Sequence, residues 1–161
     1  MEIKAVIASQ YLATLEMMKQ AISQCPDELW SNMSHTNQFW HIAYHALFYT
    51  HLYLQPTEAD FAPWAKSHAD LNDMGRPYEG KPLSKADILE YLAFCQQEVQ
   101  KQTANLEPTE PSGFSWIPLN KLELQFYNIR HLQLHVGELA ERLWAEAELE
   151  VGWVGLGHAP Q

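Results

Sequence analysis

The chain has 161 residues, of which 47% are hydrophobic, so it is long and apolar enough to bury a core of its own. Its formal net charge is −10, from 10 Lys and Arg against 20 Asp and Glu. Nucleic acids and anionic membrane surfaces attract basic patches, and the chain has no basic cluster, so we expect neither as a partner. No apolar run reaches the ~18 residues of a membrane span, and the start lacks a signal-peptide pattern. We therefore expect a cytoplasmic protein.

Helical periodicity is clear in the first third of the chain. Apolar residues recur at spacings of three and four over residues 3–25, and Pro26 ends the pattern. Residues 27–30 can form one short turn. An aromatic-rich helix is predicted from about Thr36 to Leu54, with Ser34, Thr36 and Asn37 as its candidate N-caps, and it stops before Pro56.

The middle of the chain is predicted to be a long crossover loop. Four prolines and two glycines interrupt residues 55–83, where only a short helix near residues 57–68 is expected. Ser84 and Asp87 have capping-box spacing and open a third helix that reaches about Leu106. A fourth helix is predicted from about Pro118 to about Glu148. The tail, residues 151–161, is irregular but has three apolar residues that suggest packing: Trp153, Val154 and Leu156.

These segments together predict the fold class. No strand-like alternation of useful length occurs, and the two cysteines, Cys25 and Cys95, are interpreted as buried, reduced thiols. We expect one all-α domain over residues 1–161, a four-helix bundle with a long crossover between its second and third helices. Bundle cores of this kind can hold metal ligands that project inward from facing helices.

Two pairs of histidines are spaced for metal binding. His131 and His135 lie four residues apart on the predicted fourth helix, and His41 and His45 repeat this spacing on the second. Residues at i and i+4 share a helix face with Cβ atoms about 5–6 Å apart, which lets two imidazoles reach one ion. The face of the fourth helix that carries His131 and His135 is mostly polar, although apolar residues flank it on both sides. A metal site is therefore favoured over core or surface histidines.

The residues alone leave the ligand set open. His131 and His135 are the firmest pair, and either His41 or His45 supplies the third ligand. Three histidines would leave an open position, as in catalytic zinc sites, whereas four would close the site and make it structural. Glu138 is a candidate carboxylate behind the ligands or a general base, and equally a surface residue paired with Arg142.

Two segments resemble the DinB-like superfamily of metal-binding four-helix bundles. In residues 37–45 a polar pair, Asn37 and Gln38, precedes a Trp-containing apolar run, as in the family's second-helix segment. Residues 131–138 resemble the family's fourth-helix motif, HxxxH followed by Gly and a polar residue. The resemblance spans most of the chain and implies a histidine triad for Zn, Ni or a similar divalent ion. Counted from the polar pair, the second-helix ligand is His45.

The resemblance also implies which functions to expect. Some DinB-like proteins are transferases that use a low-molecular-weight thiol, and others resemble metal-dependent hydrolases or isomerases; homodimers are frequent. We therefore expect a metal-dependent hydrolase or thiol transferase acting on a small, partly apolar molecule, with metal ligands His45, His131 and His135. Glu138 and His41 are the candidate catalytic residues, His41 lining the pocket or carrying a proton. The alternative is a non-catalytic, metal-stabilised bundle that serves as a binding or stress-response module. A homodimer is expected from the aromatic surplus of the second helix and the apolar tail.

Overall fold

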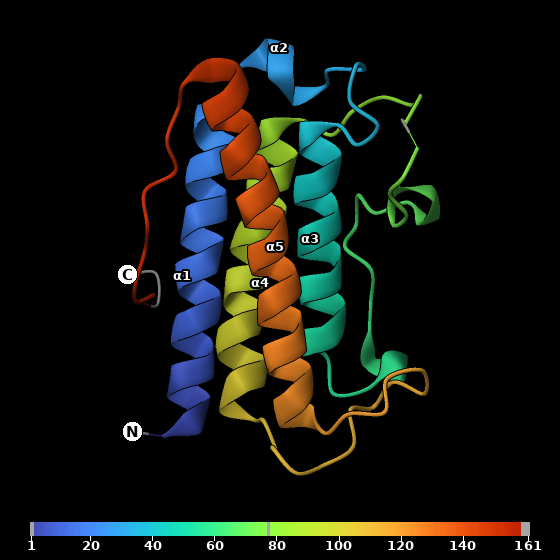
Figure 1. Cartoon of the computed structure of the whole chain (residues 1–161). Helices are drawn as coiled ribbons and strands as arrows, with labels where there is room; N and C mark the ends of the chain where they lie inside the picture. The colour runs from blue at the N-terminus through green and yellow to red at the C-terminus, as the bar shows by residue number, and fades with distance from the viewer. Residues whose placement is uncertain (1, 77, 159–161) are drawn as a thin grey trace.

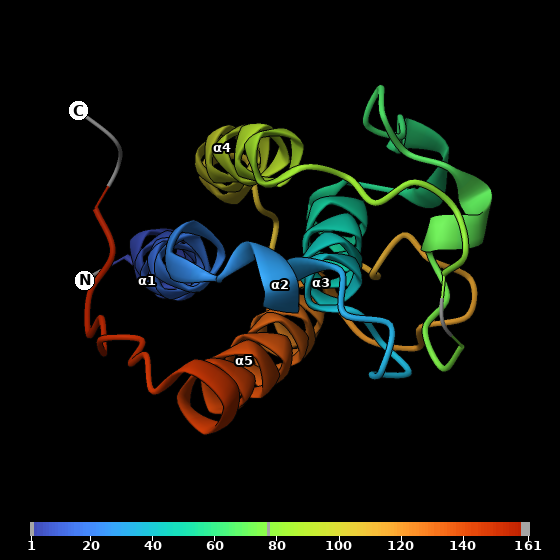
Figure 2. The ribbon, with the colours of Figure 1, turned by 90° about the horizontal axis from the view of Figure 1, so that it is seen from above.

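The computed structural model describes residues 2–76 and 78–158, and within them the regular secondary structure is entirely helical (Figure 1). Four long helices run side by side: α1 (Ile3–Gln24), α3 (Phe39–Leu54), α4 (Lys85–Ala104) and α5 (Lys121–Ala147). Seen end-on, α1 faces α3 across one diagonal and α4 faces α5 across the other (Figure 2). Each long helix thus packs against two neighbours, and the predicted all-α class is confirmed.

The core lies between these four helices, and α3 contributes most of its aromatic rings. Phe39, Trp40 and Tyr44 are all fully buried. Both cysteines are buried free thiols, as expected, Cys25 just after α1 and Cys95 on α4. None of the helices described here is both long and apolar enough to cross a membrane.

Helix α3 begins at Phe39 and not near Thr36, and one of the predicted capping residues, Asn37, has another role. The N-cap is Gln38, whose backbone is extended. The Asn37 side chain accepts a hydrogen bond from the Gly75 N–H at 2.8 Å, far along the sequence. Its oxygen is therefore not available to cap the helix, and residues 33–37 form turns ahead of α3. The short turn expected at residues 27–30 is present as α2 (Asp27–Trp30).

Helix α5 begins at Lys121, which corrects the predicted start at Pro118. Asn120 is the N-cap, and its side chain accepts from the Glu123 N–H at 2.9 Å while the Glu123 carboxylate accepts from the Asn120 N–H at 3.0 Å. This capping box satisfies two free N–H groups of the first turn. The expected capping box of Ser84 and Asp87 is also present, at the start of α4. That helix ends at Ala104, slightly before the predicted Leu106.

The connection between α3 and α4 lies against the side of α3 that faces away from α1 (Figures 1 and 2). In place of the single short helix expected near residues 57–68, it has two 3-10 turns, η1 (Glu58–Asp60) and η2 (Ala69–Leu71). Trp64 of this connection stacks on Tyr91 of α4, with ring centroids 4.5 Å apart. Pro77, one of the prolines used to predict the loop, lies outside the described residues.

The tail after α5 runs back along α1. The Gly157 N–H donates to the Ser9 carbonyl at 3.2 Å, and a side chain at Gly157 would collide with the α1 backbone at Ala13. Trp153 and Leu156 do not pack as predicted: they are 79% and 66% exposed, and only Val154 is partly buried against the core. Residues 159–161 of the predicted tail are outside the described part of the chain.

Candidate metal centre

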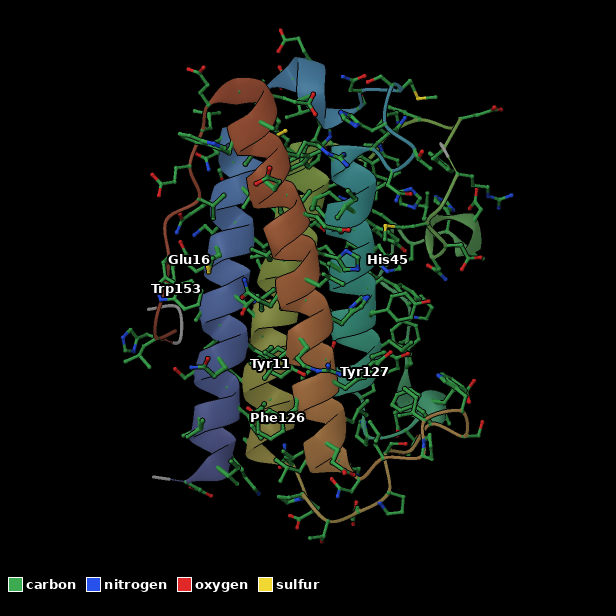
Figure 3. All side chains as sticks on the ribbon, viewed as in Figure 1. Tyr11, Glu16, His45, Phe126, Tyr127 and Trp153 are labelled. Carbon is green, nitrogen blue, oxygen red and sulfur yellow. The ribbon has the colours of Figure 1, made fainter. Side chains whose placement is uncertain are left out.

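Three histidines from two helices meet between α3 and α5. His45 comes from α3, and His131 and His135 come from successive turns of α5. One ring nitrogen of each lies within 4.8 Å of those of the other two. In Figure 3, His45 lies on the side of α3 that is next to α5. The long-range packing of α3 against α5 therefore brings together three residues that the sequence keeps far apart.

The two histidines of α5 face each other through their Nε2 atoms, which are 3.1 Å apart. The His135 Nδ1–H donates to the Glu138 carboxylate at 2.6 Å, so Nε2 is the ring nitrogen turned towards His131. The His131 Nδ1 is buried and has no hydrogen-bond partner among the described residues. This pair of rings is thus incompletely satisfied by protein groups alone.

His45 is held by the crossover connection. Its Nδ1–H donates to the main-chain oxygen of Asn72 at 2.9 Å, which leaves Nε2 as the unprotonated nitrogen of a neutral ring. Desolvation by burial lowers the pKa of His45 to about 4, against the weaker opposing effect of this hydrogen bond. Burial likewise lowers the pKa of His131 to about 4, helped by the neighbouring His135. Both rings are therefore neutral at pH 7, the form that binds metals.

His41 is not part of this three-histidine group. It lies one turn before His45 on α3, is only 1% exposed, and stacks on Trp40 with ring centroids 5.1 Å apart. Its Nε2–H donates to the Leu71 carbonyl at 2.8 Å. Burial lowers the pKa of His41. His41 and His45 share one predicted helix face, but in the structure only His45 belongs to the three-histidine group.

The spacing of Glu138 and Arg142 allowed a surface ion pair, but none of the ion pairs among the described residues joins these two side chains. The Glu138 carboxylate instead accepts from His135, with 48% of the side chain exposed. Arg142 donates to the Asn37 carbonyl at 2.7 Å and so ties α5 to the start of α3. Glu138 is therefore placed to orient His135, and none of the described hydrogen bonds joins it to His45 or His131.

Three further residues of the site were missed by sequence reasoning. The main-chain oxygens of Leu71 and Asn72 hold His41 and His45, and no side-chain pattern signals such contacts. Tyr49 packs against His45 and His131, with ring centroids 4.8 and 5.4 Å apart. Its spacing of four residues from His45 was a signal that could have found it.

Imidazole nitrogens suit zinc, copper, iron and nickel, whereas the hard ions magnesium and calcium take oxygen ligands.

Comparisons of the chain with protein-family models, with curated proteins and with solved structures find no match. The geometry of His45, His131 and His135 is therefore the observation from which a function is argued.

Proposed function

We propose that His45, His131 and His135 bind one divalent metal ion, Zn²⁺ or Ni²⁺, in a four-helix bundle of the DinB-like class. The observation that carries the proposal is the convergence of one nitrogen from each ring within 4.8 Å. Two nitrogens bound at 2.0–2.1 Å to a tetrahedral ion lie about 3.3 Å apart. The 3.1 Å between the Nε2 atoms of His131 and His135 is close to that separation.

The protonation of the rings supports the same proposal. Asn72 and Glu138 each accept the Nδ1–H of one histidine, which leaves the opposite Nε2 free to bind a metal. Metal binding requires neutral rings, and burial keeps the pKa of both His45 and His131 at about 4. The donor set therefore fits a divalent ion of intermediate softness.

We further propose that the protein is a metal-dependent hydrolase or thiol-dependent transferase that acts on a small molecule. Three histidines are the ligand number of open, catalytic zinc sites, and His41, the candidate fourth ligand, lies outside the group. When bound there, a divalent ion supplies Lewis acidity, which generates a nucleophile from water or a thiol near neutral pH. Glu138 holds the proton on His135 Nδ1 and orients the ring, and Tyr49 packs against His45 and His131.

The DinB-like assignment is supported by where the two resembling segments lie. Residues 37–45 lead into the first half of α3, and residues 131–138 form the middle of α5. Helix α3 places His45, and helix α5 places His131 and His135, at the contact between the two helices. The packing of each long helix against two others is the arrangement that a four-helix bundle requires.

Metal analysis of tag-free protein tests the ligand set. We expect about one zinc or nickel ion per chain in the parent and loss of it in His45→Ala, His131→Ala and His135→Ala. His68→Ala, which removes an exposed loop histidine, is the matched control and should keep the metal. His41→Ala should keep it as well. Full occupancy in His45→Ala with loss in His41→Ala would overturn the assignment of the α3 ligand.

A cobalt-substituted protein separates the enzyme from a non-catalytic metal-stabilised module. Three protein ligands leave a position at which an added thiol can bind, and a thiolate bound to cobalt gives a charge-transfer band in the near ultraviolet. We expect this band to appear and saturate with a low-molecular-weight thiol. A spectrum unchanged by thiols would favour the closed, non-catalytic module.

A further inference from the structure

Helix α5 carries a stripe of exposed residues on the side that no other described helix covers (Figure 2). Its members are three or four positions apart, so they lie on one face of the helix. They are Phe126, Arg130, Leu134, Gly137, Glu141 and Trp144. The three large apolar side chains among them are each more than half exposed to solvent. An uncovered apolar face of this kind is typical of a protein interface.

Gly137 is not explained by the packing of the chain itself. It lies inside α5, where glycine is less stable than alanine, and its backbone is helical. Outside the surrounding backbone of α5, no described heavy atom lies within 4 Å of the position that a Cβ atom would take. The glycine borders an open hollow of about 400 Å³, which is also lined by Ala140 and Trp144 of α5 and by Val151 of the tail. The missing side chain therefore leaves room for a side chain from another molecule.

The order of residues along the stripe is close to two-fold symmetric. From the middle outward, the pairs are Leu134 with Gly137, Arg130 with Glu141, and Phe126 with Trp144. All three pairs are centred at position 135 or half a position beyond it. In a symmetric dimer the same surface of both copies is used, and each contact occurs twice. A two-fold axis through this point would therefore bring the members of each pair together from two antiparallel copies of α5.

The two charges of the stripe favour this antiparallel direction. Among the described residues, neither Arg130 nor Glu141 takes part in an ion pair. The Arg130 Cζ atom lies 6.0 Å from the centroid of the Tyr127 ring, and both charged side chains are exposed. An antiparallel pair of helices places each arginine opposite the partner's glutamate. A parallel pair would place arginine opposite arginine and glutamate opposite glutamate, which is unfavourable.

We propose that a second copy of this chain packs antiparallel against the stripe of α5, about a two-fold axis that passes between Leu134 and Gly137. Leu134 of each copy enters the partner's hollow at Gly137, and Arg130 of each copy pairs with the partner's Glu141. An unrelated protein would have no need of the two-fold order of the stripe, so a second copy is the occupant that it fits.

The extent of the stripe suits a contact between two helices. From Phe126 to Trp144 it rises about 27 Å along the helix axis, at 1.5 Å per residue. Its two ends carry the aromatic rings and its middle carries the leucine and the glycine. The proposal does not rest on a metal ion, because the three histidines lie at the contact of α5 with α3 and not on the stripe.

Exchange of the two charges tests the antiparallel pairing, with sedimentation of tag-free protein at low ionic strength as the measurement. The parent should be a dimer at micromolar concentration. Arg130→Glu and Glu141→Arg each put like charges opposite one another at two places in the dimer, so each should raise the Kd of the dimer about tenfold. The variant with both changes restores opposite charges and should return the Kd to within about threefold of that of the parent. Arg76→Glu and Glu79→Arg make the same changes at exposed positions of the crossover connection and should leave the Kd unchanged.

Three outcomes of the charge exchange would overturn the proposal. One is a parent that sediments only as the monomer. Another is a Kd that neither single variant changes. The third is a double variant that does not recover, as expected for a parallel pair of helices or for an interface elsewhere on the chain.

Gly137→Gln tests the close contact in the middle of the stripe. Glutamine is a better helix former than glycine, so the monomer should be at least as stable to urea as that of the parent. The new side chain fills the space assigned to the partner's Leu134, so the Kd of the dimer should rise by about tenfold or more. A Kd equal to that of the parent would overturn the proposal. A loss of stability in the monomer would also overturn it, because the fold itself would then require the glycine.

Discussion

His45 donates from Nδ1 to the main-chain oxygen of Asn72 at 2.9 Å, which fixes both the orientation and the tautomer of its ring. The preceding oxygen, that of Leu71, does the same for His41. The Leu71 side chain is 1% exposed, so this part of the crossover connection is anchored in the core. The loop thus sets which nitrogen of each histidine is free, although it contributes no ligand side chain to the three-histidine group.

Glu138 accepts the Nδ1–H of His135, as the main-chain oxygen of Asn72 accepts that of His45. The first prediction tests this role of Glu138. Glu138→Gln retains the size of the side chain and loses the charge that holds the proton on His135 Nδ1. We expect the Kd for zinc to rise about 10- to 100-fold, as for other groups that orient a metal-binding histidine. Competition with a chromophoric chelator measures this Kd. Glu141→Gln, an exposed change less than one turn away, is the control, and an equal effect in both variants would contradict the role given to Glu138.

The second prediction concerns the start of α5, which carries two of the three histidines. Asn120→Ala removes the acceptor of the Glu123 N–H, so we expect the free energy of unfolding to fall by about 1 kcal/mol. Pro118→Ala, at the start predicted from the sequence, should change it by less than about 0.5 kcal/mol. Urea unfolding followed by circular dichroism compares the two. A larger loss in Pro118→Ala would mean that the helix is initiated before Asn120.

The starts of α3 and α5 show how much of the fold the sequence could predict. Periodicity identified the four long helices and the shared face of His131, His135 and Glu138, because these features depend on residues a few positions apart. The predicted start of α3 near Thr36 was wrong. The Asn37 side chain accepts a hydrogen bond from the Gly75 N–H, and no local sequence pattern indicates a partner so distant in the chain.

The choice between His41 and His45 shows the same limit. Both lie on one face of α3, so helical spacing cannot separate them, and the polar pair of the resembling segment was needed to select His45. In the structure the difference comes from packing: His45 meets α5, whereas His41 faces the crossover connection. The hydrogen bonds from these histidines go to the main-chain oxygens of Leu71 and Asn72, and such bonds cannot be predicted from the pattern of side chains.

The third prediction uses a buried histidine remote from the metal centre. His51 of α3 is 3% exposed and accepts a hydrogen bond from the Tyr91 hydroxyl at Nδ1, 3.2 Å away. Burial lowers the pKa of His51 from 6.5 to about 4, against a weaker opposing effect of Glu98. Between these two pH values the unfolded chain binds a proton that the folded protein does not, so His51 makes stability fall as the pH falls through this window.

Urea unfolding of metal-free protein at several pH values measures this effect. In His51→Leu, the dependence of the unfolding free energy on pH between about 4 and 6.5 should correspond to about one proton fewer than in the parent. Leu47→Ala is the control, since it removes a buried side chain of the same helix without changing a titrating group. It should lower stability by about 2–5 kcal/mol with little change in the pH dependence. An unaltered dependence in His51→Leu would contradict the prediction.

The last prediction concerns the homodimer. The aromatic rings of α3, one ground for expecting it, are buried within the chain itself: Phe39, Trp40 and Tyr44 are fully inaccessible. Exposed apolar side chains lie instead along one face of α5, where Phe126, Leu134 and Trp144 are 52%, 61% and 59% exposed. Gly137 lies on this face as well, with nothing within 4 Å of the position a side chain would take, so a second helix could approach closely there.

We therefore predict that a second copy of the chain covers this face of α5. The parent should sediment at micromolar concentration with twice the 18.6 kDa mass of one chain. Leu134→Glu places a charge in the middle of the face and should shift the protein to the monomer. Met33→Glu changes a side chain of similar exposure, 55%, ahead of α3 and should leave the dimer intact. Only an 18.6 kDa species for the parent would refute the dimer, and dissociation by Met33→Glu but not Leu134→Glu would place its interface elsewhere.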